Sequence, residues 1–216
     1  MSLTQTFGVF GAVGQAGLNK ALKTVFTVRP HYLHYASAPF VTSSSVLVTA
    51  MNPIAFPGVP GGIPWAVDFT IPMVDLFPAD GPLPSPLALN PDLLALRTEA
   101  TVTVGCLQGD PRDDDKGGLR PIATTLDVVA VGHPKSRYFS PGVGDVSFVV
   151  DRVVIDKVAP QSLAAVLNCL IRMMLNAALS QVHLPFDVIG GGFFKLVLQA
   201  GPNVADDRIK MWGDVA

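Results

Sequence analysis

The four histidines are the residues of this sequence with the widest chemical range, and their spacing argues against catalysis or metal binding. They are His31, His34, His133 and His183, and they lie in different segments. No pair follows the H-E-x-x-H spacing that places two ligands on one face of a helix. His31 and His34 precede an expected strand, where strand spacing would point their side chains to opposite faces. The G-x-S-x-G elbow of a hydrolase is also absent from the sequence.

Two further clusters resemble ligand-binding motifs only in part. The acidic residues Asp110, Asp113, Asp114 and Asp115 lack the alternating ligands and the distant bidentate Glu of a calcium loop. We expect them to form a solvated hairpin tip. The run Gly190–Gly192 is not followed by the lysine and hydroxyl residue of a phosphate-binding loop. We therefore expect a protein that is not an enzyme and that uses neither a metal nor a cofactor.

The two cysteines, Cys106 and Cys169, are too few and too far apart for a zinc site or a disulfide-rich scaffold. Free cysteines are among the most buried residue types, so two buried thiols are one interpretation. A single bridge between them is the other. The sequence leaves both open.

The composition contains an excess of apolar residues. Of the 216 residues, 49% are hydrophobic and 15% are charged, whereas about 25% of a typical soluble domain is charged. The net charge of -2 includes no basic block, so nucleic acid is not an expected partner. The apolar excess must fill a bilayer, a subunit interface or a ligand cavity.

A bilayer span requires about 20 nearly uninterrupted apolar residues. The best candidate, residues 163–179, contains Asn168, Arg172 and Asn176, which argues against a spanning helix. The sequence has no basic residue before Lys20 and no signal-like cleavage site. We expect a cytoplasmic protein, or a secreted or periplasmic one if a leader has been removed. The apolar stretch from Phe7 to Gly17 offers an alternative, a transient contact with a membrane.

The spacing of apolar residues predicts a helix, then a sheet, then a second helix and short final strands. Residues 9–26 have broadly helical spacing after a loose start. The alternation then changes to a period of two, and a phase slip after Val150 predicts a bulge. The proline-rich stretches 52–64 and 78–91 are expected to be loops. The alternating runs are residues 46–50, 67–73, 100–106, 126–130 and 146–150.

The second helix, residues 163–179, has the clearest pattern in the sequence. Its apolar residues form one wide stripe, and Asn168, Arg172 and Asn176 are placed on the opposite side. We predict a single α+β domain over residues 1–216, in which an antiparallel sheet curls around this helix.

At this point the sequence resembles a known family. The segments "QAGLNKALKTVF", "VSFVVDRVVIDKV", "SLAAVLNCLIRMMLNAAL" and "HLPFDVIGGGFFKLVLQAGPNVADDRIKMWGDV" follow one another as in the tubular lipid-binding superfamily, which includes the bactericidal permeability-increasing protein-like domains. The resemblance implies a long, strongly twisted sheet rolled around the helix 163–179. It also implies a seam that accepts acyl chains, carriage without catalysis, and a disulfide between Cys106 and Cys169. Basic patches for anionic head groups are missing from this sequence.

We therefore predict binding or carriage of a lipid or fatty-acyl ligand in an apolar groove between helix and sheet. The alternative is a structural or toxin-associated subunit, in which the apolar surface forms a homo- or hetero-oligomeric interface. The residues predicted to line the groove are Leu18, Leu22, Phe26, Phe69, Ile71, Val102, Val104, Phe148, Leu167, Leu170 and Met174.

Overall fold

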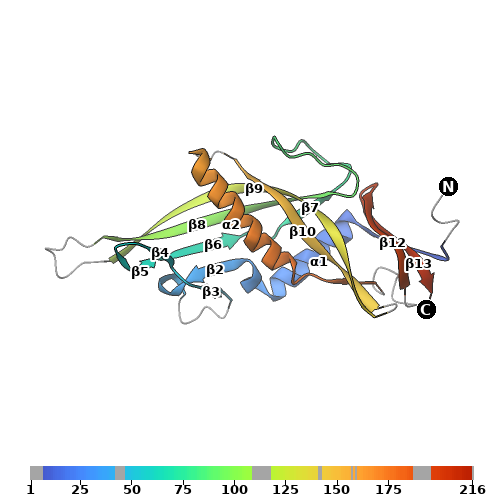
Figure 1. The fold of residues 1–216 in the computed structure, drawn as a ribbon, viewed down its shortest axis with the longest axis horizontal. Helices are drawn as coiled ribbons and strands as arrows, with labels where there is room; N and C mark the ends of the chain where they lie inside the picture. The colour runs from blue at the N-terminus through green and yellow to red at the C-terminus, as the bar shows by residue number, and fades with distance from the viewer. Residues whose placement is uncertain are drawn as a thin grey trace. The chain divides into compact units, whose positions relative to one another are not determined.

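A computed structural model describes residues 7–41, 47–108, 118–140, 143–156, 158, 160–186 and 196–215. These residues form an α+β structure, mostly strands with the two α-helices α1 and α2 (Figure 1). Two compact units are present. Unit 1 comprises residues 1–25, 72–97 and 128–216, and unit 2 comprises residues 26–71 and 98–127. Both units are discontinuous in sequence, and one domain over residues 1–216 stays a prediction.

In unit 1, a three-stranded antiparallel sheet joins the two ends of the chain. Strand β1 (Val9–Gly14) pairs with β13 (Arg208–Val215), which pairs with β12 (Leu196–Ala205). The prediction of a helix from residue 9 is wrong over the first six residues. Glycine disfavours helix, and pairing with β13 supplies the backbone hydrogen bonds of this segment instead.

Helix α1 (Gln15–Val28) follows directly. Leu18, Leu22 and Phe26 are buried, because a spacing of four residues places them on one face of the helix. The helix runs from unit 1 into unit 2 at residue 26. The predicted N-terminal helix is therefore present, but it begins six residues later than its apolar pattern suggested.

The main sheet of unit 1 follows the order β11-β10-β9-β8, with β7 beside β8. A bulge between Val150 and Arg152 of β10 shifts the register against β9, as the phase slip predicted. Gly132 of β9 lies opposite, where a β-carbon would approach the carbonyl oxygen of Val149 to 2.1 Å. The bounds are β7 (Met73–Leu76), β8 (Leu94–Gln108), β9 (Gly118–Ser140), β10 (Val143–Ile155) and β11 (Leu184–Pro185).

Helix α2 (Gln161–Leu179) begins after Pro160 and packs on β10 (Figure 1). The helix predicted for residues 163–179 is confirmed. Its two halves differ in burial, since every buried residue lies in the second half: Ile171, Met174, Leu175, Ala178 and Leu179. The first half of α2 has no buried residue.

Unit 2 holds the sheet order β9-β8-β6-β2-β3, in which β2 and β3 are parallel. The expected continuous strand over residues 67–73 is wrong, because Pro72 cannot donate a ladder hydrogen bond and β6 ends at Phe69. The bounds are β2 (His34–Ser37), β3 (Thr49–Met51) and β6 (Trp65–Phe69), with short 3-10 helices at Pro30–Tyr32 and Ala38–Phe40.

The predicted loop at residues 52–64 is wrong. It contains the hairpin β4 (Ile54–Phe56) and β5 (Val59–Ile63), which form a two-stranded sheet of their own. Prolines lowered the strand signal here, although a short hairpin tolerates them at its edges. The loop predicted at residues 78–91 is confirmed, because it contains no helix or strand. The predicted acidic hairpin tip and Gly190–Gly192 lie outside the described residues.

Candidate functional site

The polar residues of α2 face the sheet. Asn176 makes two hydrogen bonds with one strand residue: the backbone N–H of Val150 donates to Oδ1 at 2.8 Å, and Nδ2 donates to the carbonyl oxygen of Val150 at 3.0 Å. Arg172, one turn earlier, donates to the carbonyl oxygen of Asp151 at 3.2 Å. The placement of Asn168, Arg172 and Asn176 on a side opposite the buried stripe is therefore corrected: Asn176 and Arg172 bind the backbone of β10.

The open edge of β10 explains why these polar groups are needed. Beyond Val146, β10 has no strand partner on the edge away from β9 among the described residues. An open strand edge exposes backbone donors and acceptors. Side chains of α2 satisfy them at Val150 and Asp151, and this fixes the second half of the helix against the strand.

One helical turn before Arg172, at Asn168, the hydrogen bonds between α2 side chains and the backbone of β10 do not continue. The Oδ1 atom of Asn168 is buried and has no hydrogen-bond partner. Buried acceptors are normally satisfied, so an orphaned one requires a reason. Asn168, Arg172 and Asn176 follow one another at intervals of four residues, and only the first lacks a partner. The hydrogen bonding between α2 and β10 therefore leaves a gap at the Oδ1 atom of Asn168.

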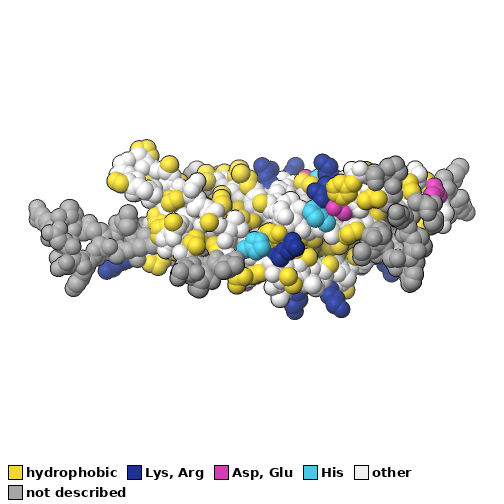
Figure 2. All heavy atoms as spheres, turned by 90° about the horizontal axis from the view of Figure 1, so that it is seen from below, with side chains coloured by type: hydrophobic (Ala, Val, Ile, Leu, Met, Phe, Trp, Pro, Cys, Tyr) yellow, Lys and Arg dark blue, Asp and Glu magenta, His cyan; other side chains and the backbone are white. Residues whose placement is uncertain are grey.

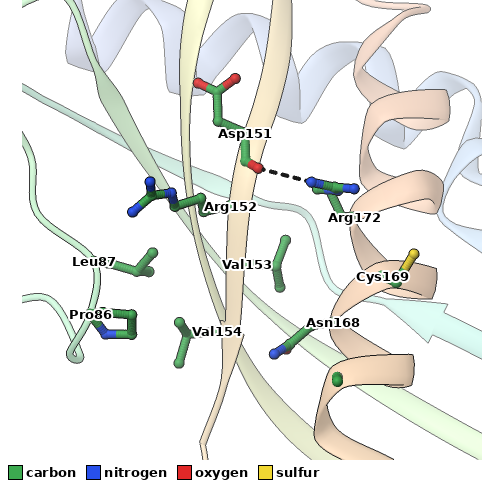
Figure 3. Close-up of a pocket in the computed structure, with 10 residues that line it drawn as sticks. Pro86, Leu87, Asp151, Arg152, Val153, Val154, Asn168, Cys169 and Arg172 are labelled. Carbon is green, nitrogen blue, oxygen red and sulfur yellow. Dashed lines mark hydrogen bonds between the residues drawn. The ribbon is translucent and has the colours of Figure 1, made fainter.

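A pocket with a volume of about 300 Å³ occupies this gap. Figure 3 shows Asn168 reaching from α2 toward β10, and Arg172 hydrogen-bonded at the Asp151 end. The lining is mainly apolar apart from these groups. It comprises Pro86 and Leu87 of the loop, Asp151 to Val154 of β10, and Ala165, Asn168, Cys169 and Arg172 of α2.

A second cavity of about 330 Å³ adjoins the first. It shares Pro86, Leu87, Asp151 and Arg152 with the first pocket and extends to Leu93 and Val131. Because the same four residues line both cavities, the two are neighbouring parts of one lined region. Each volume lies near the lower end of the range for small-molecule sites.

The Asp151 end of the pocket carries the charged groups. The side chains of Arg152 and Arg172 are exposed there. The Asp151 carboxylate forms a 2.8 Å hydrogen bond with Nδ1 of His133. Two guanidinium groups beside an apolar pocket suit an amphiphile with an anionic or strongly hydrogen-bonding head group.

The pockets are not lined by any of the eleven residues predicted to contact a ligand. In unit 1, Leu18, Leu22, Phe148 and Met174 are buried, and Leu167 and Leu170 are half-buried. In unit 2, Phe26 and Phe69 are buried, and Ile71, Val102 and Val104 are half-buried. The predicted set is thus divided between the two units.

None of the residues that line the first pocket was predicted to bind a ligand, and they come from α2, from β10 and from the loop at Pro86. The only sequence signal for them is the four-residue interval between Asn168, Arg172 and Asn176. The prediction that these residues lie on the side opposite the apolar stripe missed their position against β10. No local pattern identifies the loop, because its place beside Asp151 and Arg152 in the pocket lining depends on the tertiary fold.

Cys169 also lines the pocket and is an exposed, free thiol. The interpretation of two buried thiols is therefore wrong for Cys169. The side chain of Cys106 lies outside those described, and because Cys169 is a free thiol, the structure does not contain the disulfide with Cys106 that the resemblance implies.

Three of the four histidines, His34, His133 and His183, form ion-pair geometries with aspartates. His34 pairs with Asp68 at 2.8 Å in unit 2. In unit 1, Asp145 is buried between His183, at 3.4 Å, and Arg137, at 2.9 Å. The hydrogen bond to Asp145 raises the pKa of Arg137. Among the described residues, no three His, Cys, Asp or Glu side chains are arranged to hold a metal ion.

Part of the apolar excess is exposed. Figure 2 shows many hydrophobic and few acidic side chains on the face it presents. Helix α2 is long and apolar enough to cross a membrane by length and composition, with 28% of its most apolar window buried. The same test is passed by core helices, and the hydrogen bonds of Asn176 and Arg172 tie α2 to β10.

Comparison of the sequence with protein-family models and with curated proteins finds no match.

Proposed function

We propose that this chain binds a lipid or fatty-acyl ligand in the groove between α2 and β10 and performs no catalysis. The observation that carries the proposal is the buried, unpartnered Oδ1 of Asn168, a residue that lines a mainly apolar pocket. An acyl chain would occupy the apolar part, where each buried methylene contributes about 0.8 kcal/mol. A hydroxyl or amide of the ligand would donate to Asn168, and an anionic head group would lie beside Arg152 and Arg172.

The resemblance to the tubular lipid-binding superfamily supports the same function. It implies a long, strongly twisted sheet rolled around α2, with the acyl chain in a seam beside the helix. The α+β class, the bulged β10 and the packing of α2 on that strand are compatible with this architecture. In this proposal, the polar residues Asn168, Arg172 and Asn176 of α2 determine where the seam opens.

The test is a substitution on α2 that places a larger side chain in the pocket. Ala165 lines the pocket, whereas its neighbour Val166 does not, and both are exposed. Ala165→Phe should weaken binding of a fluorescent fatty acid by roughly tenfold or more, because the new ring occupies the space of several methylenes. Val166→Phe is the matched control and should leave the affinity unchanged. Equal affinity of both variants and the unmodified protein, or no uptake by any of them, would contradict the proposal.

A second candidate function is a protein interface. Leu163, Val166 and Met173 of α2 are 47%, 64% and 63% exposed, and exposed apolar patches commonly mark interaction sites. Light scattering distinguishes the candidates. A stable oligomer that Val166→Ser dissociates, together with an absence of extractable lipid, would favour the interface.

A further inference from the structure

The hairpin β4–β5 in unit 2 presents an apolar surface that the ligand groove does not use. All three residues of β4 are exposed, with Ile54 at 50% and Phe56 at 56%. The register pairs Ile54 with Ile63 and Phe56 with Val59 across the hairpin. Each pair shares one face of the hairpin, and the register shifts between the two pairs.

The hairpin contains no polar side chain on either face. Residues 53–64 consist only of Pro, Ile, Ala, Phe, Gly and Val, and residues 30–67 include no Asp, Glu, Lys or Arg. A protein interface normally has a polar rim and about one hydrogen bond per 100–200 Å². This hairpin offers no side chain for such bonds.

The prolines also disfavour pairing with a strand of another protein. Among the described residues, β4 and β5 pair only with each other, so each has an open edge. Pro53, Pro57, Pro60 and Pro64 have no backbone N–H to donate. Strand addition depends on main-chain hydrogen bonds, and the missing donors weaken it. The same lack of donors lowers the cost of placing the edges near acyl chains.

The tip of the hairpin is held in a defined position. Pro57 and Gly58, with Gly58 at φ +83°, occupy the two turn positions, as a type II turn requires. At the base, the indole of Trp65 donates to the carbonyl oxygen of Asn52 at 3.0 Å. The buried hydroxyl of Ser37 accepts from the backbone N–H of Trp65 at 2.7 Å. Phe56 and Val59 are thus presented by an anchored turn.

We propose that the β4–β5 hairpin inserts shallowly into a lipid bilayer, with Ile54 and Phe56 at the boundary between head groups and acyl chains. Insertion of this kind buries apolar side chains by about 5–10 Å and leaves the strand edges among head groups and water. Because the hairpin has no basic residue, binding does not require anionic lipid. This inference is independent of the ligand groove.

The test uses the full chain and phosphatidylcholine vesicles in a flotation assay. The double variant Ile54→Ser/Phe56→Ser should weaken vesicle binding by roughly tenfold or more, since two large apolar side chains no longer leave water. The control is Met73→Ser, because Met73 is 65% exposed and lies in unit 1. This control should bind as the unmodified protein does. Circular dichroism and thermal unfolding should be the same for all three, because the replaced side chains are exposed.

Two further measurements identify the mode of contact. Phe56→Trp should show a blue-shifted emission with vesicles and quenching by brominated acyl chains. Binding should change little between about 0.1 M and 1 M salt, where surface electrostatics are increasingly screened. The proposal is overturned by failure of the unmodified protein to bind, by equal binding of the double variant and the control, or by unchanged Phe56→Trp emission. Binding that requires phosphatidylglycerol and disappears in high salt overturns it as well.

Discussion

Asn176 of α2 binds both backbone groups of Val150 in β10, accepting at 2.8 Å and donating at 3.0 Å. A side-chain amide thereby takes the place of a neighbouring strand at the open edge of the sheet. The helix is held at this point by directional hydrogen bonds as well as by apolar packing.

Replacing Asn176 should destabilise the protein. Asn176→Leu leaves the N–H and C=O of Val150 without these partners, and each unsatisfied buried group costs about 1–3 kcal/mol. We expect the free energy of unfolding in urea to fall by about 2 kcal/mol or more. Met173→Ala on the exposed side of α2 is the control and should change it by less than about 0.5 kcal/mol. If the free energy of unfolding falls no further than in the control, the two hydrogen bonds between Asn176 and Val150 do not contribute to stability.

The same substitution at Asn168 should have the opposite effect on stability. Its Oδ1 is buried without a partner, so Asn168→Leu removes an unsatisfied acceptor. We expect the free energy of unfolding to stay unchanged or to rise by up to about 1–2 kcal/mol. Affinity for a ligand whose head group donates to Asn168 should fall in the same variant. Equal destabilisation by Asn168→Leu and Asn176→Leu would contradict the prediction that only Asn176 stabilises the protein through its side-chain hydrogen bonds.

Cys169 should report occupancy of the groove. It is exposed, free and part of the pocket lining. A bound fatty acid should therefore slow its reaction with a maleimide, measured by mass spectrometry of the peptide that contains it. Val166→Phe, outside the lining, should keep this protection, whereas Ala165→Phe should abolish it. If a fatty acid binds but the reaction of Cys169 with maleimide is not slowed, the ligand binds elsewhere.

Stability should fall at alkaline pH through Tyr35. Burial raises the pKa of Tyr35 to about 12, compared with about 10 in an unfolded chain. The folded state holds this proton more tightly, so the contribution is complete below pH 10 and is lost as the pH rises through 12. It amounts to at most roughly 2–3 kcal/mol.

The hydroxyl of Tyr35 also donates to the carbonyl oxygen of Tyr32 at 2.9 Å. Tyr35→Phe should therefore be less stable at neutral pH and show a shallower decline above pH 10. Because other groups titrate in the same range, the quantity to compare is the difference in slope between the two proteins. Identical slopes would rule out a role for Tyr35.

Much of the fold follows from local patterns. The stripe in α2 and the alternation in β9 and β10 identify those elements, and the phase slip after Val150 identifies the bulge. Local patterns failed where glycine and proline dominate, at β1 and at the β4–β5 hairpin. Backbone pairing with a remote or adjacent strand decides the structure there, and side-chain periodicity carries little information about it.

The sequence by itself determined which segments are apolar helices and strands, because burial of one face requires a period of 3.6 or 2. It also determined that polar residues recur every fourth position along α2. Only the tertiary structure decided that this polar face meets β10, since the edge of that strand away from β9 is left open beyond its short partner β11. The site lies between α2, β10 and the loop at Pro86, and only packing between residues remote in the chain brings these three segments together.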